Sequence, residues 1–187
     1  MATINLQFRI ATQDDAAKVQ DLVQSAFRAD DSRENWTGDK DLSAEFRAGF
    51  RVDIGDIMAK ITKPDSAVLI ALDDSGDLVG SVETVKRSSE LARISMLAVD
   101  QHYQRGGVGR QILAHAEHYC QKTWSIAQMG LNALSTRQEL ILWYERRGYV
   151  RTGETTPFPR LYSAGFKLPE DLCFIELEKD LTGSISS

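Results

Sequence analysis

Three glycines lie within four positions in the segment QRGGVG, residues 104–109: Gly106, Gly107 and Gly109. An apolar run precedes the segment and a helical pattern follows it. Glycine inside a helix costs about 1 kcal/mol relative to alanine, so bare backbone must be needed here. The N-terminus of a helix presents free N–H groups and a partial positive charge, and missing side chains let a phosphate approach the backbone. The segment is therefore expected to hold an anion.

Three phosphate-binding patterns compete for this segment. A nucleotide P-loop needs GxxxxGK[ST], but neither lysine nor serine or threonine follows Gly109 at the required place. A dinucleotide fingerprint needs a third glycine, and Arg110, Gln111 and Ile112 follow instead. The third pattern, Q/R-x-x-G-x-G/A, matches. The segment resembles the acyl-CoA pyrophosphate loop of the GNAT superfamily of N-acyltransferases.

Two flanking stretches extend this resemblance over residues 5–180. MLAVDQHYQ, residues 96–104, resembles the family's strand and lead-in, with Gln101 where proline is usual. ILWYERRGYVRTGE, residues 141–154, resembles a later helix and strand of the family. The resemblance implies acetyl-CoA as cosubstrate and no metal. Its pantetheine would pair with the backbone of Met96, Leu97, Ala98 and Val99, and its pyrophosphate would be held by Gln104, Arg105, Gly106, Gly107, Val108, Gly109 and Arg110.

The implied reaction is direct attack of an amine on the thioester, which raises two proton problems. An alkyl ammonium with a pKa near 10 must lose a proton before it can attack at pH 7. The departing thiolate is better protonated than released bare. Tyr144 occupies the family's tyrosine position and would be the general acid, unless it only packs under the cofactor. Arg93 stands where many members carry a glutamate, so Glu83 on the adjacent strand is the candidate base. A solvated carboxylate at Glu83, with a water chain as base, is the alternative.

Other polar and aromatic residues carry weaker signals. Arg137 and Leu140 replace the asparagine and alanine that the family often has before its tyrosine. His115 and His118 are spaced i, i+3, and an exposed pair is expected rather than a metal site. Cys120 and Cys173 lie in no CxxC pattern, so reduced thiols are expected. Four loop aromatics either line an acceptor pocket or anchor their loops: Trp36, Phe158, Tyr162 and Phe166.

Hydrophobic periodicity predicts the elements that must position these residues. The expected helices cover residues 12–27 (capped by Thr12), 42–61, the stretch after Gly109, and 137–147 (stopped by Gly148). The expected strands cover residues 6–10, 67–72, 78–85, 92–99, 129–134, 149–154 and 171–179, and a polar loop is expected at 28–41. Because helices interrupt a mostly antiparallel sheet, the fold class is α+β. We expect a GNAT-like mixed sheet of about six or seven strands flanked by about four helices.

Length and charge restrict the domain organisation and the classes of partner that are expected. A chain of 187 residues, 42% hydrophobic, suits one domain, with a core over 5–180 and a tail at 181–187. The net charge of −5 argues against nucleic acid, which needs a surplus of Lys and Arg. No signal peptide and no apolar run of about 18 residues is found, so a cytoplasmic protein without a membrane partner is expected.

The predicted function is acetyl transfer from acetyl-CoA to a primary amine of a small molecule or peptide, through a ternary complex. A homodimer is one expected assembly. The rival hypothesis is an acyl-CoA-binding sensor that keeps the fold without turnover. Tyr144 favours the enzyme, and the arginine at position 93 favours the sensor.

Overall fold

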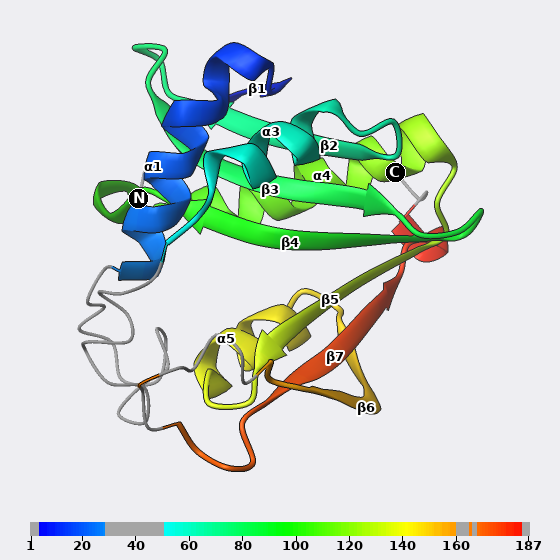
Figure 1. Cartoon of the computed structure of the whole chain (residues 1–187). Helices are drawn as coiled ribbons and strands as arrows, with labels where there is room; N and C mark the ends of the chain where they lie inside the picture. The colour runs from blue at the N-terminus through cyan, green and yellow to red at the C-terminus, as the bar shows by residue number, and fades with distance from the viewer. Residues whose placement is uncertain (1–3, 29–50, 160–164, 166–167, 185–187) are drawn as a thin grey trace.

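The computed structural model describes residues 4–28, 51–159, 165 and 168–184. Its centre is one seven-stranded mixed sheet in the order β1-β2-β3-β4-β5-β7-β6 (Figure 1). Neighbouring strands are antiparallel except β4 and β5, which are parallel. The strands are β1 (Gln7–Ile10), β2 (Ser66–Leu72), β3 (Leu78–Lys86), β4 (Leu91–Val99), β5 (Gln128–Leu134), β6 (Val150–Pro157) and β7 (Cys173–Asp180).

Four α-helices in the described residues flank the sheet: α1 (Ala16–Arg28), α3 (Ile54–Thr62), α4 (Val108–Trp124) and α5 (Gln138–Glu145). Helices α1 and α3 cover one face of β2–β4 and bury Val19, Val23 and Ile57 against it. Helix α4 covers the other face, and α5 joins the same core through Ile141 and Tyr144. The expected α+β fold is confirmed.

Strand β2 shows why the central strands read as continuous apolar runs. Val68 and Ile70 point to the core under α1 and α3, whereas Leu69 and Ala71 point to the core under α4. A strand buried on both faces has no polar side, so its sequence does not alternate. The predicted hairpin of β2 and β3 is present, closed by the turn that follows Leu72.

Two element boundaries differ from the prediction. The described part of the helix expected over 42–61 begins only at Ile54, because Asp53 caps it by accepting hydrogen bonds from the backbone of Gly55 and Asp56. Gly55 therefore lies in the first turn and is no break. Residues 29–50, with most of the expected loop, lie outside the described residues. At the other end Leu181 is fully buried and donates its N–H to Ala127, so packing continues one residue past the expected limit.

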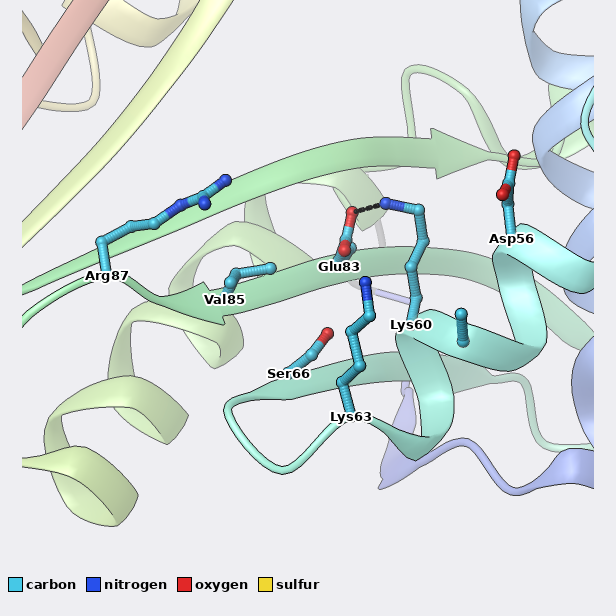
Figure 2. Close-up of a pocket in the computed structure, with 8 residues that line it drawn as sticks. Asp56, Lys60, Lys63, Ser66, Glu83, Val85 and Arg87 are labelled. Carbon is cyan, nitrogen blue, oxygen red and sulfur yellow. Dashed lines mark hydrogen bonds and ion pairs between the residues drawn. The ribbon is translucent and has the colours of Figure 1, made fainter.

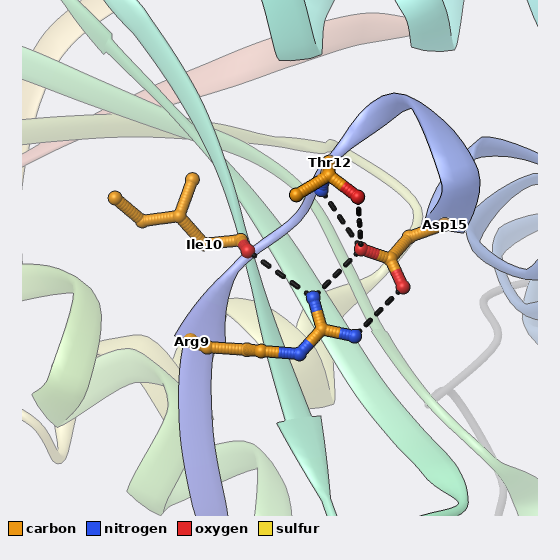
Figure 3. Close-up of polar contacts among 4 residues, drawn as sticks. All are labelled: Arg9, Ile10, Thr12 and Asp15. Carbon is orange, nitrogen blue, oxygen red and sulfur yellow. Dashed lines mark hydrogen bonds and ion pairs between the residues drawn. The ribbon is translucent and has the colours of Figure 1, made fainter.

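A polar cluster fixes the start of α1. The carboxylate of Asp15 accepts a 2.8 Å hydrogen bond from the Thr12 N–H and two from the Arg9 guanidinium, at 2.7 and 2.8 Å (Figure 3). Thr12 thus opens a single turn of 3₁₀ helix, Gln13–Asp15, from which α1 continues. These contacts lower the pKa of Asp15 to about 2, chiefly through the Arg9 hydrogen bonds. Strand β1 is thereby tied to the helix that follows it.

No helix among the described residues combines the length and the apolar character needed to cross a membrane.

Candidate functional site

Strands β4 and β5 part soon after they meet. Their parallel pairing is limited to Leu91–Arg93 against Gln128–Gly130, and the two strands diverge beyond it (Figure 1). Arg93 is therefore the last residue of β4 paired with β5. From residue 94 onward, β4 has a strand neighbour only on its β3 side within the described sheet. The backbone of the remaining β4 residues on the open side is available to a ligand.

A β-bulge interrupts β4 at this opening. Ser81 pairs with Ala98 and Glu83 with Ser95, so that both Met96 and Leu97 lie opposite Val82. Met96 has a left-handed backbone, with φ +51°. A bulge of this kind bends a strand and redirects its side chains, and such bulges are frequent beside active sites. The expected pantetheine strand, residues 96–99, thus begins at the bulge.

The glycine segment follows β4 directly, and the structural reason for a glycine differs at each of its three positions. A Cβ on Gly106 would lie 2.5 Å from the Cδ1 of Ile4, so a side chain there would require Ile4 to move. Gly107 is the N-cap of α4 with φ +78°, a backbone that favours glycine. A Cβ on Gly109 would meet only Trp143 and Val99, at 3.6 Å or more. The protein itself therefore leaves room for a side chain at Gly109.

Hydrogen bonds anchor this loop to distant parts of the chain. Tyr103 donates its hydroxyl to Asp73 in the β2–β3 turn at 2.6 Å. Gln104 donates to the Val99 carbonyl at 3.4 Å, and Gln111 to the Ile4 carbonyl at 3.1 Å. The N–H groups of the first turn of α4 lack intrahelical acceptors, as at every helix N-terminus. The loop presents them on a fixed frame.

Arginines that form no ion pair with another described residue lie beside the loop. A nitrogen of Arg110 lies 4.0 Å from the Cβ position of Gly107. Arg147, one turn beyond Trp143, stacks on the Trp143 ring at 3.8 Å and leaves its Nε buried without a hydrogen-bond partner. Burial lowers the pKa of Arg147, and the positive charges of Arg146 and Arg110 lower it further. An anion placed here would relieve that repulsion.

Tyr144, the predicted general acid, lies on α5 and is only 6% exposed. Its ring meets Trp143 and Tyr149 edge to face, with centroids 5.0 and 5.7 Å apart. Its hydroxyl makes no hydrogen bond within the described residues, whereas the Tyr149 hydroxyl donates to Glu117 at 2.9 Å. Burial raises the pKa of Tyr144 to about 12, although Arg137 opposes the rise.

Glu83, the predicted base, is 4% exposed and lies on the face of the sheet that α3 covers. Its Oε2 pairs with Lys60 Nζ at 2.7 Å and accepts a hydrogen bond from Ser95 beside the bulge. Ser81 and Val85 share its face, and Val82 and Thr84 point to the α4 side. Val82 and Val85 therefore lie on opposite faces, and β3 alternates regularly from Ser81 to Val85.

Arg93, where the family's glutamate is usual, forms an ion pair with Glu176 on β7 at 2.8 Å. Glu176 also accepts hydrogen bonds from Asn132 and Thr156. Burial opposes the charge of Glu176, but the hydrogen bonds led by Arg93 prevail and lower its pKa. This network links β4 to strands β5, β6 and β7, and it gives Arg93 a structural role.

A cavity of about 400 Å³ lies between α3 and the end of β3 (Figure 2). Glu83 and Lys60 both line it, and their ion pair is drawn in Figure 2. The sequence analysis missed Lys60 and Ser95 as partners of Glu83. Lys60 lies on the polar side of α3, whereas the sequence pattern that predicted this helix consists of its apolar residues. The lining residues are Asp56, Ala59, Lys60, Lys63, Ser66, Glu83, Val85 and Arg87.

The remaining candidates are placed as follows. His118 is exposed, but His115 is half-buried and stacks on Phe8 with centroids 4.3 Å apart, so the two do not form the expected exposed pair. Cys120 and Cys173 are free thiols, and burial raises the pKa of Cys120 to about 12. Phe158 lies against Phe174, whereas Trp36, Tyr162 and Phe166 fall outside the described residues. No group of three potential metal ligands occurs in the described part of the chain.

One family model matches the chain. The family is described as "Acetyltransferase (GNAT) domain", and the match covers residues 40–160, which include the bulge, the glycine segment and α5. By sequence, the chain matches no curated protein.

Solved structures with the same fold are similar over nearly the whole chain. A spermidine N-acetyltransferase from Vibrio cholerae in complex with CoA and spermine has a TM-score of 0.69 at 12% identity, covering 97% of this chain and 98% of that one. Ard1 from Thermoplasma volcanium has a TM-score of 0.69 at 17% identity, over 94% and 97%. A GNAT-family acetyltransferase from Staphylococcus aureus Mu50 has a TM-score of 0.65 at 14% identity, over 95% and 100%.

Proposed function

The chain belongs to the GNAT family of acetyltransferases, and on that premise we propose that it transfers the acetyl group of acetyl-CoA to a primary amine by direct attack within a ternary complex. The acceptor is a small molecule or a peptide. The observation that carries the proposal is the run from the bulged, half-unpaired end of β4 into the glycine segment. It offers a strand edge and a phosphate-binding turn in continuous order.

The residues that would hold acetyl-CoA fit its chemistry. The open edge of Met96–Val99 suits the amides of pantetheine, which can add to a strand edge. The turn from Gln104 to Arg110 suits the pyrophosphate, since helix N–H groups and Arg110 face the same place. A methyl group would fit at Gly109, and the Nε of Arg147 is unpartnered although the guanidinium stacks on Trp143 and donates to the Trp143 carbonyl. We therefore add Arg147 to the proposed phosphate-binding set.

Acetyl-CoA supplies a thioester, whose carbonyl carbon is open to a neutral amine. In the proposed reaction a new C–N bond forms and the C–S bond breaks. Glu83 is the proposed acceptor of the amine's proton, and Lys60 and Ser95 hold its carboxylate in place. Glu83 is buried and held by two partners, so it is not the solvated carboxylate considered as the alternative.

Tyr144 is the proposed donor of a proton to the leaving sulfur. Its pKa of about 12 keeps the hydroxyl protonated at every pH at which the enzyme would work. The hydroxyl has no acceptor within the described residues, in contrast to that of Tyr149. Its burial excludes water, which strengthens a hydrogen bond to a developing thiolate.

The test is to measure acetyl-CoA binding and CoA release separately. Calorimetric titration of acetyl-CoA checks the cosubstrate, and a thiol-reactive dye detects CoA release with a panel of primary amines. Saturable binding with steady amine-dependent release supports the acetyltransferase. Saturable binding with no release from any amine would instead support the sensor. Absence of binding would remove both hypotheses.

A further inference from the structure

The cavity beside Glu83 is more positive than the protein around it. Three cations line it, Lys60, Lys63 and Arg87, against the two acids Asp56 and Glu83. The whole chain carries a net charge of −5, so this excess is local. Lys60 and Glu83 neutralise each other at 2.7 Å. The unbalanced positive charge therefore comes from Lys63 and Arg87.

Lys63 and Arg87 have no ion pair or side-chain hydrogen bond among the described residues. Figure 2 shows them entering the cavity from opposite sides, with Val85 and Ser66 between them. Asp56 lies at the far end from Arg87. The Ser66 Oγ is buried and has no hydrogen-bond partner. Two exposed cations and a buried, unsatisfied hydroxyl thus line the same cavity, and these donors can recognise an anion such as a carboxylate.

The position of Glu83 orients whatever occupies the cavity. It lies between Lys60 and Ser95, and Ser95 adjoins the β4 bulge at Met96. A substrate amine bound at Glu83 would thus be at the end of the cavity nearest β4. The rest of that molecule would extend over Val85 toward Lys63 and Arg87. A volume of about 400 Å³ is near the lower end of ligand pockets, which suits a small molecule better than a peptide.

We propose that the acceptor is a small amino acid-like molecule, with its amine at Glu83 and its carboxylate between Lys63 and Arg87. This inference rests on the proposed acetyltransferase function and narrows its substrate class. It excludes polyamines as preferred acceptors, although spermine is bound in one structure of the same fold. A second ammonium group in this cavity would face like charges at Lys63 and Arg87.

The experiment compares amines that differ only in a carboxylate. The pairs are L-phenylalanine against phenethylamine and 4-aminobutyrate against propylamine, with spermidine as the polycation. CoA release gives kcat and KM, and calorimetry in the presence of CoA gives acceptor affinity. The variants are Lys63→Glu and Arg87→Glu. Lys86→Glu is the matched control, since it makes the same charge change on β3 but does not line the cavity.

We expect at least one carboxylate-bearing member to have a kcat/KM about 10- to 100-fold above that of its partner, the range for a lost charge-assisted hydrogen bond. Lys63→Glu and Arg87→Glu should raise its KM about tenfold or more with kcat nearly unchanged, and should leave the KM of the partner amine unchanged or lower. Lys86→Glu should change neither.

Equal use of both members of each pair, preference for spermidine, or equal effects of the variants on both members would overturn the inference while leaving the acetyltransferase intact. If no amine releases CoA, the proposed function fails, and the calorimetric comparison still decides the inference. Tighter binding of the carboxylate members, lost in Lys63→Glu but kept in Lys86→Glu, would support it. Equal binding would refute it.

Discussion

Two neighbouring tyrosines, Tyr144 and Tyr149, show how similar buried side chains can have different uses. Both are nearly inaccessible and their rings meet edge to face. Tyr149 gives its proton to a hydrogen bond with Glu117, which Lys179 also contacts at 2.9 Å. Tyr144 keeps its proton unshared within the described residues. Both rings are part of the core, and only the hydroxyl of Tyr144 is proposed to act on a bound substrate.

Replacing Tyr144 with phenylalanine keeps the ring and removes the proton. We expect turnover to fall by about 10²-fold or more, within the range for a lost general acid, with acetyl-CoA affinity little changed. The loss should appear in single-turnover rates, since the chemical step is affected. Because the pKa of Tyr144 is about 12, the wild-type rate should not decline between pH 8 and 10. A phenylalanine variant with the wild-type single-turnover rate would remove Tyr144 from the mechanism.

Tyr149→Phe is the matched control for that experiment. It loses the hydrogen bond to Glu117 and should cost about 1 kcal/mol of unfolding free energy. The single-turnover rate of the folded variant should stay within a few-fold of wild type, because Tyr149 has no proposed part in the proton transfer. A rate as low as that of Tyr144→Phe would mean that packing, and not the proton, explains the loss.

Substitutions at Gly109 can test whether this glycine is needed for the fold or for binding acetyl-CoA. Alanine at this position would make only ordinary contacts with Trp143 and Val99, and it favours the helix by about 1 kcal/mol. We therefore expect Gly109→Ala to unfold no more easily than wild type yet to bind acetyl-CoA more weakly. Gly109→Asp should abolish binding, because it adds a negative charge where the pyrophosphate is expected. Calorimetry and thermal unfolding of both variants check this, and wild-type affinity in folded Gly109→Asp would refute the phosphate site.

At the scale of the elements, the ion pair at the start of α1 should make the stability of the fold depend on pH. The pKa of Asp15 is lowered from 3.8 to about 2, so the folded state holds its proton less tightly than the unfolded state. The resulting stabilisation is fully present above about pH 4 and is lost as the pH falls toward 2. Arg9 is about half exposed, so we place the effect at about 1–2 kcal/mol after screening.

Asp15→Asn should therefore be less stable than wild type by about 1–2 kcal/mol at pH 7, and the difference should shrink between pH 4 and 2. Urea unfolding at several pH values measures it. Asp14→Asn is the control, because it removes the neighbouring acid and leaves the ion pair of Arg9 and Asp15 in place. A constant gap between Asp15→Asn and wild type down to pH 2 would show that the ion pair does not carry the stability.

The elements were predictable where the pattern is local. The hairpin of β2 and β3, the strand β4 and the helix α4 each have apolar periodicity and clear turn residues, and all were found at nearly the predicted positions. Hydrophobic periodicity does not determine the register between strands. The bulge at Met96 depends on pairing with β3, and the sequence around it reads as an uninterrupted apolar strand.

The site was predictable only where its residues lie close together in the sequence, within a recognisable motif. The glycine segment and Tyr144 lie in motifs that can be read along the sequence. Glu83 was named as a candidate, but its partners are Lys60, 23 residues earlier, and Ser95, 12 residues later. The cavity lined by Glu83 and Lys60 exists only after α3 packs on β3. Its charge and its implied acceptor could not be inferred before the fold was known.

The molecule as a whole is two sheet halves with a narrow junction. Strands β1–β4 form one half and β5–β7 the other, and the paired segments that join them are Leu91–Arg93 and Gln128–Gly130. The ion pair of Arg93 and Glu176 reinforces this junction from the side. Beyond Arg93 the open edge of β4 leaves N–H groups to solvent or to a ligand. The unliganded protein should therefore exchange amide hydrogens rapidly along this edge.

Acetyl-CoA should change that exchange in a defined pattern. If pantetheine adds to β4, alternate amides of residues 94–99, those directed toward β5, should become protected, together with the amides of the first turn of α4. The amides of β4 directed toward β3 are already hydrogen-bonded and should change little. Hydrogen–deuterium exchange followed by NMR, with and without acetyl-CoA, resolves the two sets. Desulfo-CoA should give the same protection, since the interaction needs the amides and not the thioester. Protection confined to α4, with no change along β4, would mean that the phosphates bind as proposed but the pantetheine does not lie on this strand.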